Sequence, residues 1–217
     1  MSSRRSSLTI AALLFAAVLQ ATAQEATPDN STAVGNGISY GIVVDNSGTY
    51  RKMLEELIQF VGKVLDDQQS EDEAFFVRFI DVEKIKLSQE LTSDVTEIRD
   101  STENMYVEGG QKAITDAVRV AGDYLAKNGK KEYAARRSIL LVTDGDDRGS
   151  GSKPEQAIKV LKDAGIRLIA VAVSDDKVQT KLLERMTRES GGRLFVLKHK
   201  GELRTAAGEV AAALRNP

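Results

Sequence analysis

Ile42-Val43-Val44-Asp45-Asn46-Ser47-Gly48-Thr49-Tyr50 is a segment in which an apolar run ends abruptly in an acid, two hydroxyls and a glycine. Residues 38–44 are nearly all apolar, as expected of a central strand that is covered on both faces. From Tyr50 to Leu65 the apolar residues recur at the three- and four-residue spacing of a helix with one buried face. We therefore predict a buried strand, a polar loop and an amphipathic helix.

The rest of the chain repeats this alternation of strand and helix. One pair of strands differs, because residues 74–80 and 82–87 are separated by Asp81 alone, which is too short for a crossover helix and implies an antiparallel pair. The charges on 82–87 place that strand at an edge. The pattern predicts a doubly wound, mostly parallel six-stranded α/β sheet with one antiparallel edge strand and helices on both faces. The other strands are expected over 137–143, 166–173 and 193–197, and the other helices over 92–104, from Gly109 onward, from Pro154 onward, over 177–190 and over 201–214.

The first 23 residues have the plan of a secretory signal peptide. Arg4 and Arg5 precede an apolar run, and Ala21-Thr22-Ala23 is an A-x-A cleavage site. The run is shorter than the roughly 20 apolar residues of a transmembrane helix, so we expect no membrane insertion after cleavage; an uncleaved anchor is the alternative. The expected organisation is a signal peptide over 1–23, a flexible leader over 24–37 and one domain over 38–217, in a protein exported to a periplasm or out of the cell.

Charge and cysteine content exclude several functions. Cleavage would reduce the basic residues from 30 to 28 against 32 acidic ones, which leaves a formal net charge of −4. Such a chain has no general attraction for nucleic acid or an anionic membrane. The chain has no cysteine, which excludes thiol catalysis and zinc–thiolate sites, and the fold needs no disulfide.

Two acidic loops follow predicted strands, and each begins with an aspartate. Asp45, Ser47 and Thr49 place one carboxylate and two hydroxyls at alternate positions, and Asp144 follows strand 137–143. Hard oxygen ligands of this kind suit Mg2+, Ca2+ or Mn2+. Ligands of doubly wound sheets bind at the carboxyl ends of the strands, where strand order reverses. If the two strands are neighbours at that point, Asp45 and Asp144 face each other; the alternative for each loop alone is a structural turn.

Several segments, taken together in their order and spacing, resemble the von Willebrand factor type A (VWA) domain, and more closely its exported bacterial version. The resemblance covers about residues 38–197. Its segments are 43–49 (VVDNSGT), 79–81 (FID) with 91–94 (LTSD), 109–118 (GGQKAITDAV), 141–147 (LVTDGDD) and 190–195 (SGGRLF).

The resemblance implies a monomeric protein-binding module without enzymatic activity. The family holds a divalent ion at a metal-ion-dependent adhesion site. Carried over by position, the Ser47 and Thr49 hydroxyls would contact Mg2+, or Mn2+ or Ca2+, and Asp45 and Asp144 would bind it directly or through water. An Asp or Glu of a partner protein would complete the coordination shell.

Lys112 departs from the family pattern, because it stands where the family usually has a metal-contacting Thr. The next hydroxyl, Thr115, is displaced by about 4.5 Å along a helix axis. If the ammonium points inward, it neutralises the acids and repels an ion: a unit-charge pair at about 4 Å and a dielectric of about 20 is worth about 4 kcal/mol, doubled for a divalent ion. If it extends to water, three or four ligands remain. Metal binding therefore depends on the direction of this ammonium.

Other functions stay open from the sequence. The same fold can serve as a metal-independent interaction domain, in which Lys112 engages the acids or a partner's carboxylate. A Mg2+-dependent phosphatase-like hydrolase would use an acid-ended strand and a lysine, but it needs a second Asp where Ser47 stands. The loop 148–153 precedes a helix but fails the spacing of a phosphate-binding loop. The single histidine, His199, lies between two lysines and is expected to be an exposed loop residue.

Overall fold

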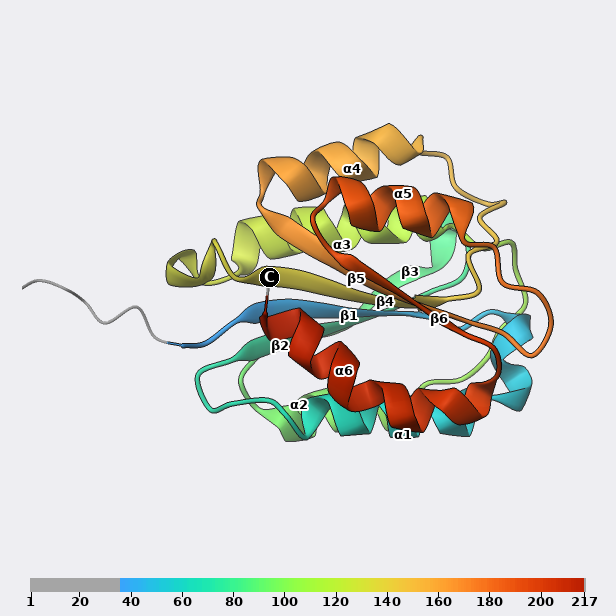
Figure 1. The fold of residues 1–217 in the computed structure, drawn as a ribbon, viewed down its shortest axis with the longest axis horizontal. Helices are drawn as coiled ribbons and strands as arrows, with labels where there is room; N and C mark the ends of the chain where they lie inside the picture. Colours follow the sequence, from blue (N-terminus) through green and yellow to red (C-terminus); the bar gives the residue numbers. More distant parts are fainter. Residues whose placement is uncertain (1–35, 217) are drawn as a thin grey trace, which may run out of the picture. The chain divides into compact units, whose positions relative to one another are not determined.

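The computed structural model describes residues 36–216. The predicted signal peptide, and all of the predicted leader before residue 36, lie outside the described residues. Within them the chain forms one sheet with helices on both faces (Figure 1), which confirms the predicted fold class.

The sheet has six strands in the order β3-β2-β1-β4-β5-β6. Neighbouring strands are parallel except for β2 and β3, which are antiparallel, with β3 at one edge. Strand order reverses between β1 and β4, so the first and fourth strands are neighbours at the switch point, which meets the condition for Asp45 and Asp144 to face each other. The strands are β1 Ser39–Asp45, β2 Glu73–Phe79, β3 Ile85–Thr92, β4 Arg137–Thr143, β5 Ile166–Val173 and β6 Arg193–Leu197.

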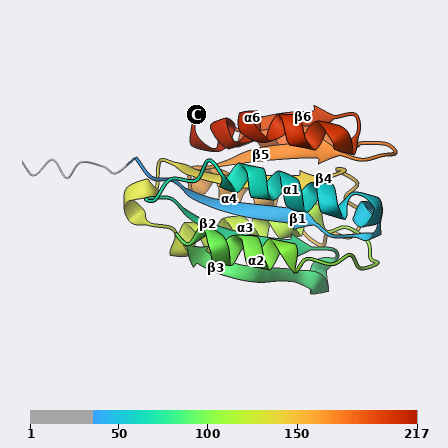
Figure 2. The same cartoon turned by 90° about the horizontal axis from the view of Figure 1, so that it is seen from below.

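Helices pack on both faces because the central strands are apolar on both faces. In β1, Ile42 and Val44 belong to the core on one side and Val43 to the core on the other, as the alternation of side chains along a strand requires. The first core lies under α1 (Leu54–Leu65), α2 (Val95–Glu103) and α6 (Leu203–Arg215), and Figure 2 shows α1 between the other two. The second lies under α3 (Ile114–Asn128), α4 (Pro154–Asp163) and α5 (Lys181–Glu189).

The edge strand begins later than predicted. Residues Val82–Lys84 form a short 3-10 turn, and β3 starts after it. The Asp81 carboxylate accepts a hydrogen bond from the Glu83 amide (3.1 Å), and the Lys84 amide donates to the Asp81 carbonyl (3.0 Å). The turn reverses the chain, which a direct strand-to-strand step at Asp81 would not allow.

Several helices also start later than predicted, and for α2 and α3 a cap or a backbone bond lies at the boundary. Asp94 caps α2 by accepting an amide of its first turn (2.8 Å), after β3 has run on to Thr92. The segment before α3 is irregular, and Ala113 at its end donates to the Ile80 carbonyl (2.7 Å). The helix predicted from residue 177 begins only at Lys181. The helix predicted from Tyr50 is split into a 3-10 turn, Gly48–Lys52, and α1.

Candidate functional site at the carboxyl ends of the strands

Asp45 and Asp144 follow neighbouring strands at the same end of the sheet. β1 and β4 run in parallel register up to Val44 and Val142, so Asp45 and Thr143 end side by side. The Thr143 hydroxyl donates to Asp45 Oδ2 (3.0 Å), and the Ser47 amide donates to Asp45 Oδ1 (2.9 Å). The topology therefore brings the two acid-ended strands together around a buried carboxyl group.

The Asp45 carboxyl has an unusual acidity because it is fully buried. Burial raises the pKa of Asp45 from 3.8 to about 6. The neighbouring Ser47 side chain and the hydrogen bond from the Ser47 amide lower this pKa, the charge of Asp144 raises it further and the charge of Lys112 lowers it. The two carboxylates and the ammonium thus act on one another electrostatically.

Two adjacent residues after β1 have buried polar atoms without a partner. Ser47 and Asn46 are each 1% exposed, and neither Ser47 Oγ nor Asn46 Oδ1 makes a hydrogen bond to any residue in 36–216. Buried polar atoms are nearly always bonded, so such an exception points to a missing ligand, water or ion. Thr49, the third predicted ligand, is exposed and is the second residue of the 3-10 segment Gly48–Lys52.

The Lys112 ammonium points inward, to the acids. Lys112 Nζ lies 2.6 Å from Asp144 Oδ2, with the two side chains 10% and 6% exposed. The other oxygen, Asp144 Oδ1, accepts the Asp146 amide (3.0 Å). At this distance and burial the Coulomb attraction is on the order of several kcal/mol before the cost of desolvation. The Lys112 side chain therefore extends inward, where its ammonium neutralises an acid, and does not extend to water.

The backbone of Lys112 is held in place by the loop that follows β4. The amides of Gly149 (2.7 Å) and Arg148 (3.2 Å) both donate to the Lys112 carbonyl. A Cβ at Gly149 would lie 2.3 Å from the Gln111 carbonyl oxygen, so this close approach requires glycine. These bonds hold the main chain of Lys112 in place, and its side chain reaches the acids from this fixed position.

Asp147 is a structural residue that the sequence pattern did not single out. Its carboxylate accepts the Ile114 (3.1 Å) and Thr115 (3.2 Å) amides, and also the hydroxyls of Thr115 (2.6 Å) and Ser150 (2.7 Å). It thus caps α3, whose own N-cap residue, Ala113, has no capping side chain. The Thr115 hydroxyl is consumed by this cap, which agrees with its prediction as a poor substitute ligand.

A family model for the von Willebrand factor type A domain matches residues 41–208. The chain belongs to the VWA family. The match runs from within β1 to within α6 and includes both acidic loops. A comparison with curated protein sequences found no significant relative.

Solved VWA-like structures share this fold at low sequence identity. BatB from Bacteroides thetaiotaomicron is 14% identical, with a TM-score of 0.65 over 83% of this chain and 100% of that one. A von Willebrand factor type A protein from Catenulispora acidiphila is 16% identical, with a TM-score of 0.70 over 82% of this chain and 43% of that one. An aerotolerance-related membrane protein from Bacteroides fragilis is 16% identical, with a TM-score of 0.64 over 83% of this chain and 100% of that one. Within residues 36–216 of the present chain, no helix is long and apolar enough to cross a membrane.

The fit of a VWA-type metal ion depends on Ser47 and Lys112. The unpartnered Ser47 Oγ is a donor of the kind that Mg2+ accepts. Lys112, however, already binds one of the two acids and would repel a second cation. In the described part of the chain no group of three or more His, Cys, Asp or Glu side chains is placed to hold an ion. The oxygen donors have the right chemistry, but with Lys112 in place the residues do not fit a bound divalent ion.

Two features that the sequence did not favour as sites are engaged in other contacts. His199 is exposed, and its Nε2 lies 3.3 Å from Glu202 Oε1. In the loop 148–153, the amides of Gly151 (2.6 Å) and Ser152 (3.3 Å) donate to Asp116 Oδ2. An internal carboxylate thus takes the amides that a phosphate would need.

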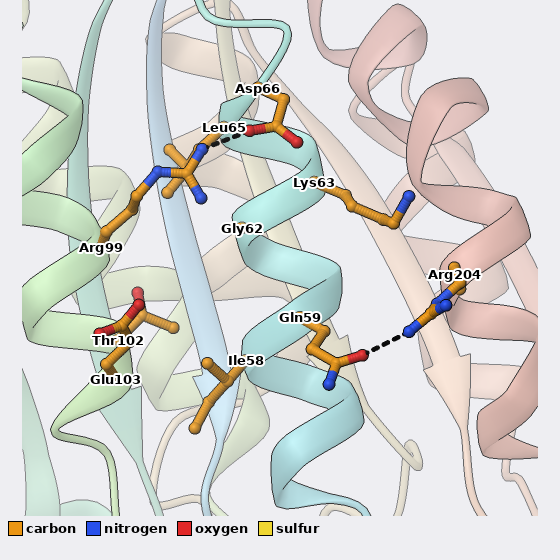
Figure 3. A pocket seen from close by; sticks show the side chains of 10 residues that line it. All are labelled: Ile58, Gln59, Gly62, Lys63, Leu65, Asp66, Arg99, Thr102, Glu103 and Arg204. Carbon is orange, nitrogen blue, oxygen red and sulfur yellow. Dashed lines mark hydrogen bonds and ion pairs between the residues drawn. The ribbon is translucent and has the colours of Figure 1, made fainter.

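A separate pocket of about 440 Å³ lies among α1, α2 and α6, the helices that cover one face of the sheet (Figure 3). Its main polar groups are already paired: Arg99 Nη2 with Asp66 Oδ1 (2.5 Å), and Arg204 Nη2 with Gln59 Oε1 (2.8 Å). The pocket is lined by no residue of the carboxyl-end site and offers it no extension.

Proposed function

We propose that this chain is an exported, monomeric VWA module that binds a protein partner at the carboxyl ends of β1 and β4. The observation that carries the proposal is the buried, unpartnered Ser47 Oγ beside two buried acids. The fold alone does not require a buried hydroxyl without a hydrogen-bond partner, because main-chain groups or water normally satisfy a buried hydroxyl. VWA domains are generally interaction modules, and a ligand at this end of the sheet agrees with the general rule for doubly wound folds.

The partner group that suits this face is the carboxylate of an Asp or Glu. Lys112 provides a buried cation, and beside it the loop after β4 borders a hollow of about 480 Å³. Arg148, Lys181 and Arg185 line this hollow; the two arginines are paired with Asp146, Glu155 and Glu189, whereas Lys181 forms no ion pair within residues 36–216. The acid in its lining, Asp147, is turned to the α3 amides. The cationic lining favours an acidic segment of the partner.

Tyr106 adds an aromatic contact on the other flank of the face. Its carbonyl accepts the Asn46 side-chain amide (2.8 Å), and its ring, 4.2 Å from the Arg78 guanidinium, is 52% exposed. Exposed Tyr and Arg side chains are frequent anchors of protein interfaces.

Photo-crosslinking tests the binding face directly. A photo-reactive phenylalanine analogue is placed at Thr49, at Tyr106 or, as a control, at exposed Glu132, at the opposite end of β4. We expect the first two versions to capture the same protein from a periplasmic or secreted extract, and the Glu132 version to capture none. Capture from Glu132 alone, or none from any position, would contradict the proposal.

Export is supported by the composition of residues 1–23. We expect the mature protein to begin at Gln24 and to be found outside the cytoplasm. The mass of the protein in the periplasmic or medium fraction checks this. An unprocessed chain retained in the cytoplasm would exclude export.

Metal-ion-dependent docking is a second candidate, favoured by the free Ser47 hydroxyl as an ion ligand. It requires an ion to displace Lys112 from Asp144. A hydrolase is the least supported candidate, because Ser47 stands where the phosphatase pattern needs an acid. We expect no turnover of a phosphate ester in the presence of Mg2+; turnover that is abolished by Asp45→Asn would support the hydrolase.

A further inference from the structure

We infer that the Lys112 ammonium permanently holds the place of the metal ion, so that this VWA site binds a partner carboxylate without a metal. The inference deepens the proposed function for its partner, but the assignment of the cation stands on the geometry of the chain alone. It rests on the position of Lys112, on the charge sum of the site and on the unused donors of the ammonium.

The position of the ammonium is built into the fold. The Lys112 carbonyl accepts two amides of the loop that starts at Asp144, the same residue that its Nζ contacts at 2.6 Å. Both ends of the lysine are thus bonded to the segment after β4. A surface lysine that had turned inward by chance would not have its main chain tied to the same segment as its side chain.

The charge of the resident ammonium opposes the binding of an added divalent ion. Asp45 and Asp144 carry up to two negative charges, and Lys112 supplies one positive charge at bonding distance. A divalent ion would balance the two acids if Lys112 were neutral or absent. With Lys112 in place, the same ion would change the net charge of the site from −1 to +1 and would have to approach an ammonium that already occupies Asp144, which repels it.

The ammonium also has donors to spare for a ligand. It has three N–H groups, and within residues 36–216 its one hydrogen bond is to Asp144. Ser47 supplies a hydroxyl that makes no hydrogen bond to a described residue. A partner carboxylate would take these donors as charge-assisted hydrogen bonds, the contact that the ion would otherwise provide.

Ion titration tests the assignment without a partner. The folded chain is freed of metal with a chelator, and the heat of binding and the melting temperature are followed as Mg2+ or Mn2+ is added to millimolar concentration. We expect no heat and a shift in melting temperature below about 1 °C, because an ion that does not bind does not stabilise. A saturable heat or stabilisation of the wild type that Asp45→Asn abolishes would overturn the inference.

Two matched variants separate the charge of Lys112 from its size. Lys112→Arg keeps the charge and should remain indifferent to both ions. Lys112→Thr removes the charge and adds a hydroxyl, and its affinity for Mn2+ should be at least about tenfold higher than that of the wild type. A folded Lys112→Thr chain without this gain would overturn the inference; if this variant does not fold, the wild-type titration still decides.

The partner readout keeps this inference distinct from the proposed function. Crosslinking at Tyr106, which leaves every candidate ion ligand in place, is repeated in chelator and in Mg2+. Equal capture in both supports metal-independent docking, and capture only with Mg2+ overturns it. If no partner is captured in either, the proposed function fails, whereas an ion-indifferent wild type with an ion-binding Lys112→Thr still supports the resident cation.

Discussion

Charged side chains are buried at both ends of the sheet, but their hydrogen bonds and ion pairs differ between the two ends. At the amino end, Asp72 is fully buried, accepts the amides of Ile38 (2.9 Å) and Gln69 (2.7 Å), and forms an ion pair with Arg215. At the carboxyl end, the one buried cation, Lys112, pairs with Asp144 and not with Asp45, and Ser47 Oγ has no partner among the described residues. The acid of the first arrangement is closed off by bonds within the fold, although Arg137 Nε at the same end makes no hydrogen bond to a described residue, whereas the second arrangement is open at its acids.

Further bonds at the amino end show what the closed arrangement does. The Glu73 carboxylate accepts the Ser39 hydroxyl (2.5 Å) and the Lys130 amide (2.7 Å), and the Arg137 guanidinium donates to the Gly129 carbonyl (2.8 Å). These bonds tie strands to the loop after α3. Buried charge at this end serves stability, whereas at the other end it is kept available for a ligand. The comparison predicts opposite effects of neutralising an acid at the two ends.

The largest expected effect is at the amino end. Asp72→Ala removes the acceptor of two backbone amides and the partner of Arg215, and we expect a loss of about 3 kcal/mol in the free energy of unfolding. Urea unfolding measures it. The control is Asp66→Ala, which breaks the exposed pair with Arg99, in which Asp66 is 65% exposed; it should cost about 0.5 kcal/mol or less. Similar losses for the two variants would show that the amino end is not a closed network.

At the carboxyl end, neutralising Asp45 should stabilise the protein. The pKa of Asp45 is raised by burial from 3.8 to about 6, so the folded state binds this proton more tightly than the unfolded state. The free energy of unfolding therefore falls as pH rises from about 4 to 6, by up to about 3 kcal/mol at about 1.4 kcal/mol per pKa unit. In chelator, Asp45→Asn should be more stable than wild type by about 1–3 kcal/mol at pH 8, and the difference should vanish near pH 4.

Asp116→Asn is the matched control with the opposite sign. Although burial raises the pKa of Asp116, its hydrogen bonds with Ser152 and Gly151 outweigh burial and lower the pKa. The wild-type carboxylate thus stabilises the folded state above its unfolded pKa and loses that contribution as pH falls. Asp116→Asn should be destabilising at pH 8, with the effect fading in acid. A difference in unfolding free energy between Asp45→Asn and wild type that does not change with pH would contradict the raised pKa of Asp45.

Much of this fold could be predicted from the sequence because its strands are continuous apolar runs. β4 and β5 are covered on both faces, and their bounds follow the change from apolar to polar residues. The starts of the edge strand and several helices could not be predicted in this way. Bonds between distant segments set them, such as Ala113 to the Ile80 carbonyl and Gln179 to the Asp144 carbonyl (2.8 Å).

The candidate site shows the same division. The residues that gather at the switch point follow from the order of the strands, and the departure at Lys112 is visible in the sequence. The direction of its ammonium is not, because the Gly149 amide, 37 positions along the chain, holds its main chain. One feature of the sequence could have indicated the role of Asp147. The N-cap residue of α3, Ala113, has no capping side chain, so the first amides of this helix need an acceptor from another segment.

The smallest expected effect concerns hydroxyls at the two ends. Ser138 is buried at the amino end of β4, where its Oγ donates to the Leu214 carbonyl (2.9 Å), so Ser138→Ala should cost about 1 kcal/mol of unfolding free energy. The exposed Thr49 hydroxyl bonds to no other described residue, and Thr49→Ala should change stability in chelator by less than about 0.5 kcal/mol. Urea unfolding of the two variants, run side by side, measures the difference. A loss for Thr49→Ala as large as that for Ser138→Ala would mean that the Thr49 hydroxyl stabilises the fold. Of the two hydroxyls at the carboxyl end, only that of Ser47 would then remain available for a ligand.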